Sequence, residues 1–252
     1  MLPLFRRGQR VANSFSMPAR AARFAAKYDF DLSGDLLNAM RNHKDSLSKV
    51  SQERISTELM KIIELDDPSH AIEILIGLKV LEECRTDILD WLITWESPVS
   101  IPLRFAALFC EWNADTIGAK MRALRFPNKL IYSVKRIADL YPKSFWARTD
   151  KEIRQLVMSA GNDLEDTLKL ADATYPYFGG MSVPKIDRIR EIAENEDLSN
   201  PLDGKEIMFL LDITSGPVIG EAVDEMRDYI AENGPTSKLI MGNHLLNWYT
   251  MR

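Results

Sequence analysis

The sequence predicts an all-α protein, folded as an irregular curved array of about 12 helices. Apolar residues recur at three- and four-residue spacing through almost the whole chain, which is the period of an amphipathic helix. Runs of β-branched residues are short, and none alternates apolar with polar residues over more than about five positions, so we expect no strand. No segment repeats at a fixed period, which argues against a regular solenoid.

Local signals place the individual helices. In residues 51–65, Ile55, Leu59 and Ile62 form one apolar face, and Ser51 is suited to cap the first turn. Four other helices open at a proline, where a missing N–H is not needed: Pro68, Pro127, Pro184 and Pro217. The same spacing predicts helices over residues 18–28, 33–42, 68–84, 86–95, 101–112, 115–124, 127–140, 149–160, 162–173, 184–195, 204–211, 217–232 and 236–248.

The composition is that of an ordinary globular protein. With 252 residues, of which 46% are hydrophobic, the chain can bury a large core without metals or disulfides. Charged residues interrupt every apolar stretch well short of the ~20 residues of a membrane span, so we expect no membrane partner. Cys84 and Cys110 lack C-x-x-C spacing and the three histidines lie far apart, so we expect no metal site. Both cysteines are interpreted as reduced core residues of a cytoplasmic protein.

The net charge of −5 conceals alternating blocks. Residues 1–54 and 104–154 are basic, whereas residues 55–103 and 155–252 are acidic. A basic face on an acidic chain favours a polyanionic partner that is bound at chosen places. Solvated helix faces would give the same pattern, so charge alone does not decide between the two interpretations.

The first 28 residues contain six basic residues and no acid. A mitochondrial transit peptide would share this composition. We disfavour that interpretation because residues 18–30 continue into the helical pattern without a break.

Asp29 and Asp31 form a D-x-D pair, the spacing with which two carboxylates hold the metal ions of nucleotidyl transfer. Such a site needs a rigid strand, a third carboxylate and a glycine-serine turn nearby. Because the two aspartates fall between two predicted helices, we interpret them as turn residues.

A cluster of basic residues surrounds the junction at Pro127, where one predicted helix ends and the next begins. These residues favour a ridge that binds a sugar-phosphate backbone: Lys120, Arg122, Arg125, Lys129, Lys135 and Arg136. Cations at the end of a helix also satisfy its dipole, which is the alternative.

The segment Ser215–Gly220 is a second candidate for anion binding. Its glycine-proline turn opens a helix and leaves the first amides free to face a phosphate, near Gly216 and Gly220. The acids that follow at once, Glu221, Asp224 and Glu225, oppose an anion, so a tight helix–helix turn is the alternative.

Three stretches of the chain carry a family resemblance. The first stretch is Arg20–Phe30 with Val50–Leu59, which has the patterns R-x-x-RF-x-x-x-x-x-F and S-x-ER-x-x-x-E. The second is Leu103–Lys129, which ends in LRFPNK. The third is Leu202–Ile207, with the sequence LDGKEI, followed by Gly216–Gly220, with the sequence GPVIG. In these stretches the chain resembles the class II, bacterial-type CCA-adding tRNA nucleotidyltransferases and their poly(A) polymerase relatives. Phe126 replaces the second leucine of the family's L-x-L-PNK junction.

The resemblance implies a division into a neck-like RNA-binding region (1–66), a helical body (67–178) and a tail (179–252). It implies that the basic ridge grips the acceptor stem of a tRNA and that the tail near Gly216 and Gly220 meets the tRNA elbow. It also implies that three neck residues lie near the nucleotide or near the catalytic head: Arg20, Arg23 and Arg54.

The departures from the family pattern concern catalysis. In the family a β-sheet head precedes the neck and holds the metal-binding carboxylates, and we find no such segment in this sequence. The family's Glu-Asp-x-x-Arg motif, which reads the incoming base, is also lost. One register puts Asn13, Ser14 and Met17 on its defining positions, and the other puts Ser16, Met17 and Arg20 there.

We therefore assign no catalytic residue and no metal ligand to the chain. Under the first hypothesis, the chain is the RNA-binding helical portion of a nucleotidyltransferase, and a separate head chain supplies catalysis together with Mg²⁺ and ATP or CTP. Under the second, it is a headless, non-catalytic relative that binds RNA or acts as a scaffold. A further alternative is that these residues are a truncated or misannotated start of a longer enzyme, which a head encoded in frame upstream of Met1 would show. The expected partner is tRNA or another structured RNA.

Overall fold

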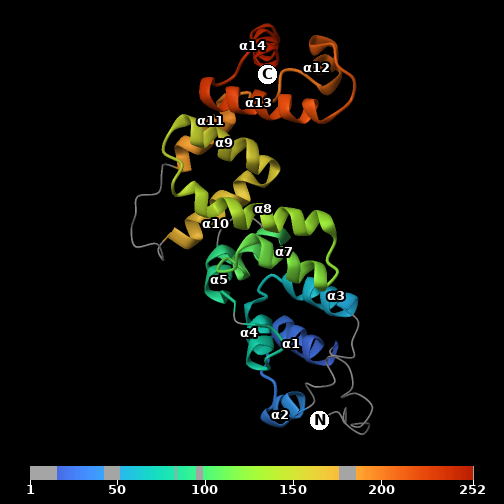
Figure 1. The fold of residues 1–252 in the computed structure, drawn as a ribbon. Helices are drawn as coiled ribbons and strands as arrows, with labels where there is room; N and C mark the ends of the chain where they lie inside the picture. Colours follow the sequence, from blue (N-terminus) through green and yellow to red (C-terminus); the bar gives the residue numbers. More distant parts are fainter. Residues whose placement is uncertain (1–15, 43–51, 83, 95–98, 176–185, 252) are drawn as a thin grey trace. The chain divides into compact units, whose positions relative to one another are not determined.

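The computed structural model describes residues 16–42, 52–82, 84–94, 99–175 and 186–251, and no residue in these ranges forms a strand (Figure 1). The predicted all-α class is confirmed. Within the same ranges, no helix is long and apolar enough to cross a membrane.

Each segment predicted to be helical contains a helix. The observed bounds are α1 Ser16–Tyr28, α2 Gly34–Asn42, α3 Gln52–Ile63, α4 Ser69–Gly77, α5 Thr86–Ile93, α6 Ile101–Leu108, α7 Ala114–Ala123, α8 Asn128–Ser144, α9 Asp150–Ala160, α10 Leu164–Thr174, α11 Ile186–Asn195, α12 Gly204–Leu211, α13 Pro217–Asn233 and α14 Lys238–Thr250. A short 3₁₀ helix, η2 (Gly161–Asp163), joins α9 to α10.

Two helix ends differ clearly from the prediction. Helix α4 ends at Gly77 rather than near residue 84, because Lys79 adopts a left-handed φ of 56° and turns the chain back onto the carbonyl of Leu75. Helix α8 continues past residue 140 and through Pro142 to Ser144. There the burial of Leu140 and Tyr141 outweighs the single hydrogen bond that the proline removes.

The chain forms two compact units. Unit 1 is Met1–Asp139 with Asp172–Pro176, and unit 2 is Leu140–Ala171 with Tyr177–Arg252. The division into neck, body and tail stays a prediction.

Small residues let α1 approach its neighbours closely in unit 1. Ala19, Ala22 and Ala25 are fully buried along one side of α1, which packs against α3 and α4. Helix α3 contributes Leu59 and Ile62 to the same core. At helical spacing, three alanines in place of larger side chains bring the helix axes together without leaving a void.

A buried carboxylate, Glu58 of α3, joins α3 to α1. Only 5% of this residue is exposed, and three cations surround its two oxygens. The Nε atoms of Arg20 and Arg23 lie 3.7 and 3.5 Å away, and the Nζ atom of Lys61 donates a hydrogen bond at 3.0 Å. A carboxylate removed from water needs such partners, so the register between the two helices is fixed by charge as well as by apolar contact.

Arg104 of α6 secures the other end of α3. Its guanidinium donates hydrogen bonds to the carbonyls of Ile63, at 2.7 Å, and of Leu65, and to that of Val99 at 3.2 Å. Ile63 is the last residue of α3, and Leu65 and Val99 lie outside the helices, so Arg104 supplies donors where helical hydrogen bonding has ended. Burial lowers the pKa of the Arg104 guanidinium, although it stays charged at neutral pH.

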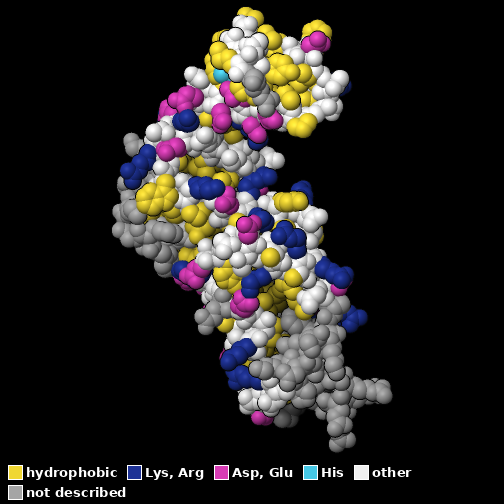
Figure 2. Space-filling model, in the orientation of Figure 1, with side chains coloured by type: hydrophobic (Ala, Val, Ile, Leu, Met, Phe, Trp, Pro, Cys, Tyr) yellow, Lys and Arg dark blue, Asp and Glu magenta, His cyan; other side chains and the backbone are white. Residues whose placement is uncertain are grey.

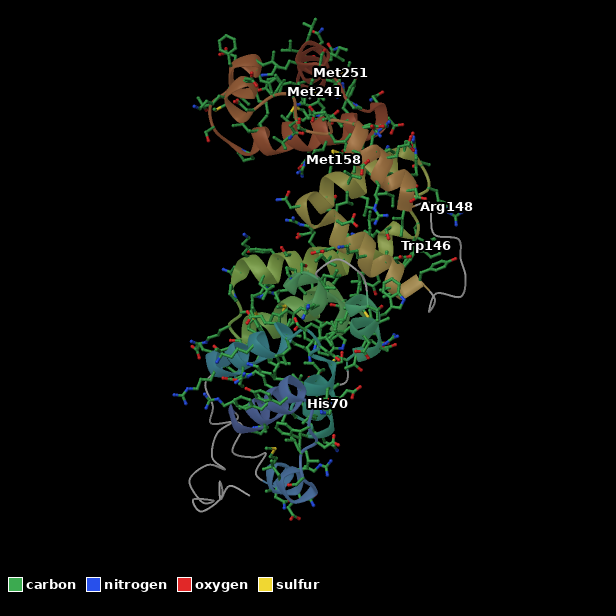
Figure 3. The ribbon with its side chains drawn as sticks, turned by 180° about the vertical axis from the view of Figure 1, so that it is seen from behind. His70, Trp146, Arg148, Met158, Met241 and Met251 are labelled. Carbon is green, nitrogen blue, oxygen red and sulfur yellow. The ribbon has the colours of Figure 1, made fainter. Side chains whose placement is uncertain are left out.

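Two apolar clusters form the core of unit 2. The first gathers α9, α10 and α11 around Ile153, Leu156 and Ile189. The second gathers α12, α13 and α14 around Met226 and Met241, with Met158 of α9 packed against it (Figure 3).

Arg154 of α9 ties three segments of unit 2 together. Its guanidinium donates to both carboxylate oxygens of Glu196, at 2.6 and 3.2 Å, and to the carbonyl of Ala231 at the end of α13. The same guanidinium lies against Gly234, whose φ of 81° turns the chain out of α13.

Replacing Glu58 with glutamine is expected to lower the free energy of unfolding by about 2 kcal/mol, because the largely buried Arg23 would then face a neutral amide. Glu53→Gln is the matched control, since Glu53 is exposed and its loss should cost less than about 1 kcal/mol. Urea unfolding followed by circular dichroism measures both. Equal effects of the two substitutions would contradict a structural role for the buried carboxylate.

Candidate nucleic-acid interface

The turn between α7 and α8 presents the basic residues that the sequence singled out. Arg125 adopts a left-handed φ of 60°, and the amide of Phe126 donates back to the carbonyl of Met121. Phe126 is buried, with its ring edge-on to Phe105 at 5.2 Å between centroids. This buried aromatic anchors the turn and leaves Arg125 at the surface.

An ion pair connects this turn to the start of α3. The Arg125 guanidinium binds the carboxylate of Glu53, and Arg54 is the next residue of α3. Arg122 and Lys129 flank the turn, and both are exposed and make no ion pair within the described ranges. We call Arg54, Arg122, Arg125 and Lys129 the turn surface. Figure 2 shows Lys and Arg side chains lying over α3, α7 and α8 of unit 1.

Lys120 is held by neighbouring groups within unit 1. Its ammonium forms an ion pair with Glu82 at 2.5 Å and lies 4.6 Å from the centre of the Trp112 ring. An RNA phosphate would have to compete with both partners for this cation.

Lys135 is held in a similar way. Its side chain lies across Gly118, where an added methyl group would come within 2.6 Å of the Lys135 stem, and its ammonium donates to Asp115 at 2.9 Å. This hydrogen bond, with the charge of Arg122 as a smaller contribution, lowers the pKa of Asp115. Arg136 is exposed and lines a shallow polar cavity of about 460 Å³ together with Lys135 and Asp115.

Two of the three neck arginines have a structural contact. Arg20 and Arg23 face the buried Glu58, and the Arg23 guanidinium also lies 4.6 Å from the centre of the Phe24 ring. Arg54 is exposed. A position of these three residues near a nucleotide or a head stays a prediction.

The glycine turn before α13 is open to solvent. Gly216 is extended, Pro217 occupies the first turn of α13, and an added methyl group at Gly216 or Gly220 would meet no atom within 4 Å. Both glycines are exposed. The turn is therefore accessible to an anion, and the role of Gly216 and Gly220 in RNA binding stays a prediction.

The aspartates of the D-x-D pair lie in the turn between α1 and α2, as predicted. Both Asp29 and Asp31 are exposed, and Asp29 has a left-handed φ of 51°. Within the described ranges, no three His, Cys, Asp or Glu side chains are grouped as metal ligands would be. Asn13 and Ser14 of the base-reading motif, and the first 15 residues as a whole, lie outside the described residues.

The cysteines have the surroundings of unreactive core residues. Cys110 is buried and Cys84 is half-buried, and neither forms a disulfide. Burial raises the pKa of each thiol to about 11, so both are protonated at neutral pH.

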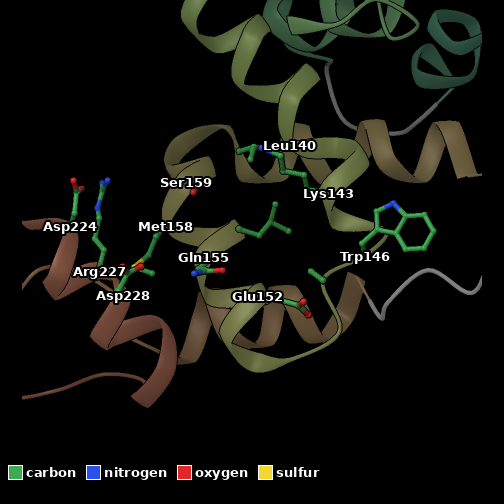
Figure 4. A pocket seen from close by; sticks show the side chains of 12 residues that line it. Leu140, Lys143, Trp146, Glu152, Gln155, Met158, Ser159, Asp224, Arg227 and Asp228 are labelled. Carbon is green, nitrogen blue, oxygen red and sulfur yellow. The ribbon is translucent and has the colours of Figure 1, made fainter.

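Sequence reasoning did not anticipate a cavity in unit 2. It has a volume of about 670 Å³ and lies among the end of α8, α9 and α13. Figure 4 shows Asp224, Arg227 and Asp228 of α13 at one side of this cavity and Trp146 at the other. The lining carries both signs of charge, unlike the turn surface. No local sequence signal marks the cavity, because one of its walls, α13, lies far in the chain from α8 and α9.

Comparisons with known proteins agree with the resemblance. Residues 29–84 match a family model described as "Probable RNA and SrmB-binding site of polymerase A". The CCA-adding enzyme of Lactococcus lactis subsp. cremoris is 26% identical over 230 residues, which are 85% of this chain and 53% of that protein. The CCA-adding enzyme of Listeria innocua is 26% identical over 217 residues, which are 76% of this chain and 55% of that protein.

A solved structure shares the fold. The crystal structure of Bacillus stearothermophilus CCA-adding enzyme in complex with CTP matches 93% of this chain and 61% of that chain, with a TM-score of 0.61 and 20% identity. The chain therefore has a helical fold found in that enzyme. Taken with the sequence matches, this makes the chain a relative of the class II CCA-adding enzyme and poly(A) polymerase family. It spans between about a third and just over half the length of the curated relatives that it matches.

Replacing Lys135 with methionine is expected to raise the pKa of Asp115 toward the ordinary aspartate value, because the hydrogen bond that stabilises its charged form is lost. Titration of the aspartate carboxyl carbons by NMR measures this change. Lys129→Met is the control and should leave Asp115 unaffected. An unchanged pKa in Lys135→Met would show that Lys135 does not bind Asp115 in solution.

Proposed function

We propose that this chain binds the sugar-phosphate backbone of a structured RNA, with tRNA as the expected partner. It would do so as the RNA-binding helical portion of a CCA-adding or poly(A) polymerase-type nucleotidyltransferase. One observation carries the proposal: the Arg125–Glu53 ion pair attaches the basic α7–α8 turn to α3, and α3 lies within the segment that matches the RNA-binding family model.

The distribution of charge supports a local interface. The chain as a whole is acidic, so it has no general attraction for RNA. Arg122 and Lys129 are exposed on the turn surface and have no ion-pair partner in the described ranges. Two such cations can replace the counterions of RNA phosphates and gain the entropy of their release.

The proposed recognition depends on shape rather than on base sequence. The deep major groove of an RNA duplex is closed to side chains, so a helical surface reads phosphate positions and 2′-hydroxyl groups. Arginine suits this task because its planar group binds phosphate in a bidentate manner. In the described ranges, the turn surface offers three arginines and one lysine on and beside a turn that is fixed by Phe126.

Nucleotide addition would require more than these residues. The reaction uses two metal ions that bind the triphosphate and stabilise the leaving pyrophosphate, and carboxylates must hold these ions. The described residues do not offer such a carboxylate set. We propose that a head from another chain supplies it, together with the Mg²⁺ and the ATP or CTP site.

A second candidate function is that of a non-catalytic RNA-binding or scaffolding relative. It is favoured by the lost acids of the base-reading motif, since a chain that still served a head would be expected to keep them. The two candidates share the RNA surface and differ in whether a head restores activity.

The double variant Arg122→Ala with Lys129→Ala is expected to weaken binding of whole tRNA. It should also flatten the dependence of log K on log[salt] by roughly 0.7 to 0.9 per lost phosphate contact. Glu53→Gln should have the opposite effect on affinity, because it removes the acid that is paired with Arg125 and releases this cation. Gel shifts over a salt series measure both changes.

The matched control removes two positive charges from unit 2, as Arg148→Ala with Arg227→Ala. If this control and the turn-surface variant weaken binding equally, the effect comes from net charge and the proposed interface is wrong. Absence of binding by the unmodified chain at low salt would reject RNA binding altogether.

The purified chain, supplied with CTP, ATP and Mg²⁺, is expected not to extend a tRNA that lacks its terminal nucleotides. Incorporation of labelled nucleotide measures this. Extension by the chain alone would overturn the assignment of catalysis to another chain. Extension only after addition of a separate head domain would favour the first candidate function. If the tRNA is extended neither without nor with the head domain, the second candidate function is favoured.

A further inference from the structure

The bundle of α12, α13 and α14 has an apolar face in addition to its core. Its core side chains, such as Ile207, Met226 and Met241, are buried. On the outside, 91% of Phe209 and 76% of Leu239 remain exposed. Figure 2 shows hydrophobic side chains gathered over these helices. Two large apolar side chains this exposed are costly to hydrate, and neighbouring ones of this size usually mark an interaction site.

A groove of about 440 Å³ runs between α12 and α14 beside these side chains. Six lining residues are apolar or small, namely Leu202, Phe209, Leu210, Leu239, Gly242 and Leu246, and four are polar or charged, namely Lys205, Glu206, Lys238 and Asn243. A methyl group added at Gly242 would sit 3.7 Å from Leu210, at ordinary van der Waals distance, so α12 and α14 pack closely at this point.

Helix α14 is apolar on both sides. Met241 and Leu245 face the core, whereas Leu239 and Leu246 face outward. Between Lys238 and Arg252 the sequence contains no Lys, Arg, Asp or Glu. A helix with apolar residues on all sides is normally covered on all sides, and the cores of protein interfaces are depleted of charge in the same way.

The charges around the groove disfavour a nucleic acid as the occupant. Lys205 and Lys238 lie at one end, and the Lys238 ammonium is already paired with Glu206 at 2.5 Å. The rest of the lining offers apolar groups and the amide of Asn243. A phosphate backbone would find too few cations here, whereas an apolar protein face would match the leucines and Phe209 that line the rest of the groove.

We propose that the α12–α14 face is a two-fold interface between two copies of this chain. A second copy brings the same apolar side chains, with its few charges at the end where Lys238 is paired with Glu206. It also brings a protruding Phe209 that can enter the facing groove, as an isologous contact requires. The amide of Asn243 both donates and accepts hydrogen bonds, so it can pair with its own copy across the axis. Antiparallel α14 helices would have opposed dipoles.

The exposed area suits a weak dimer. At roughly 200 Å² for a large apolar side chain, Phe209, Leu239 and the 39% exposed Leu246 present about 400 Å² per copy. Two copies would bury about 800 Å² of this surface. The polar rim would bring the total to the roughly 1,000 Å² at which specific interfaces begin. The inference does not rest on RNA binding.

The test is sedimentation velocity of the full chain from about 1 to 100 μM, the range expected for a weak interface. The unmodified chain should shift from monomer to dimer within it. Phe209→Asp and Leu239→Lys should remain monomeric with unchanged circular dichroism, since both side chains are largely exposed. Tyr132→Asp is the matched control, because it places an acid at an exposed aromatic in unit 1 and should still dimerise.

Asn243→Cys tests the two-fold geometry. Under mild oxidation it should form a disulfide-linked dimer, while the unmodified chain, with its buried or half-buried thiols, should not. A monomer at every concentration, a dimer that survives both substitutions, or a failure of Asn243→Cys to cross-link would each overturn the proposal. So would loss of tRNA binding in Phe209→Asp with the dimer intact, because the face would then belong to RNA.

Discussion

Unit 1 depends on the buried carboxylate of Glu58 and the three cations around it. A carboxyl group with 5% exposure needs neighbours in place of the lost water, so α1 and α3 must lie where Arg20, Arg23 and Lys61 reach it. Lys61 donates a hydrogen bond to Oε1, whereas Oε2 has the Arg23 charge beside it without a hydrogen bond. Charge pairing also occurs at the surface of unit 1, where it contributes less. There Lys120 is paired with Glu82 and Lys135 with Asp115. On an acidic chain, internal pairing of this kind decides which cations remain available to a polyanion.

The motifs that carry the family resemblance are also the residues that join the helices. The two arginines of the R-x-x-RF pattern meet the last glutamate of the S-x-ER-x-x-x-E pattern, Glu58. The first glutamate of that pattern, Glu53, meets Arg125 of the LRFPNK junction. Each of these charged residues therefore has a partner on another helix or at the α7–α8 turn. This explains how short and individually modest motifs can indicate one fold.

Periodicity predicted each α-helix in the part of the chain that the structure describes, because each buries one face, and it failed at helix ends where tertiary contacts override local signals. The Lys79 turn ends α4 early, and the buried Leu140 and Tyr141 carry α8 through Pro142. The basic residues were found from the sequence, but their availability was not. Lys120 is neutralised by Glu82, 38 residues earlier, and Arg125 by Glu53, 72 residues earlier. The exposed α12–α14 face was missed because an apolar stripe predicts burial without naming its partner.

The two surfaces inferred for this chain differ in how salt affects binding: one depends on charge and the other on apolar contact. Contacts between the turn surface and phosphate weaken as the salt concentration rises, because the entropy gained when counterions are released becomes smaller when the solution already holds more of them. An uncharged apolar face has no such term, and salts excluded from protein surfaces strengthen it. A chain with both surfaces can therefore keep its self-association under conditions that release RNA. Charge patterning along the sequence, basic in 104–154 and without Lys, Arg, Asp or Glu in 239–251, assigns each surface its response.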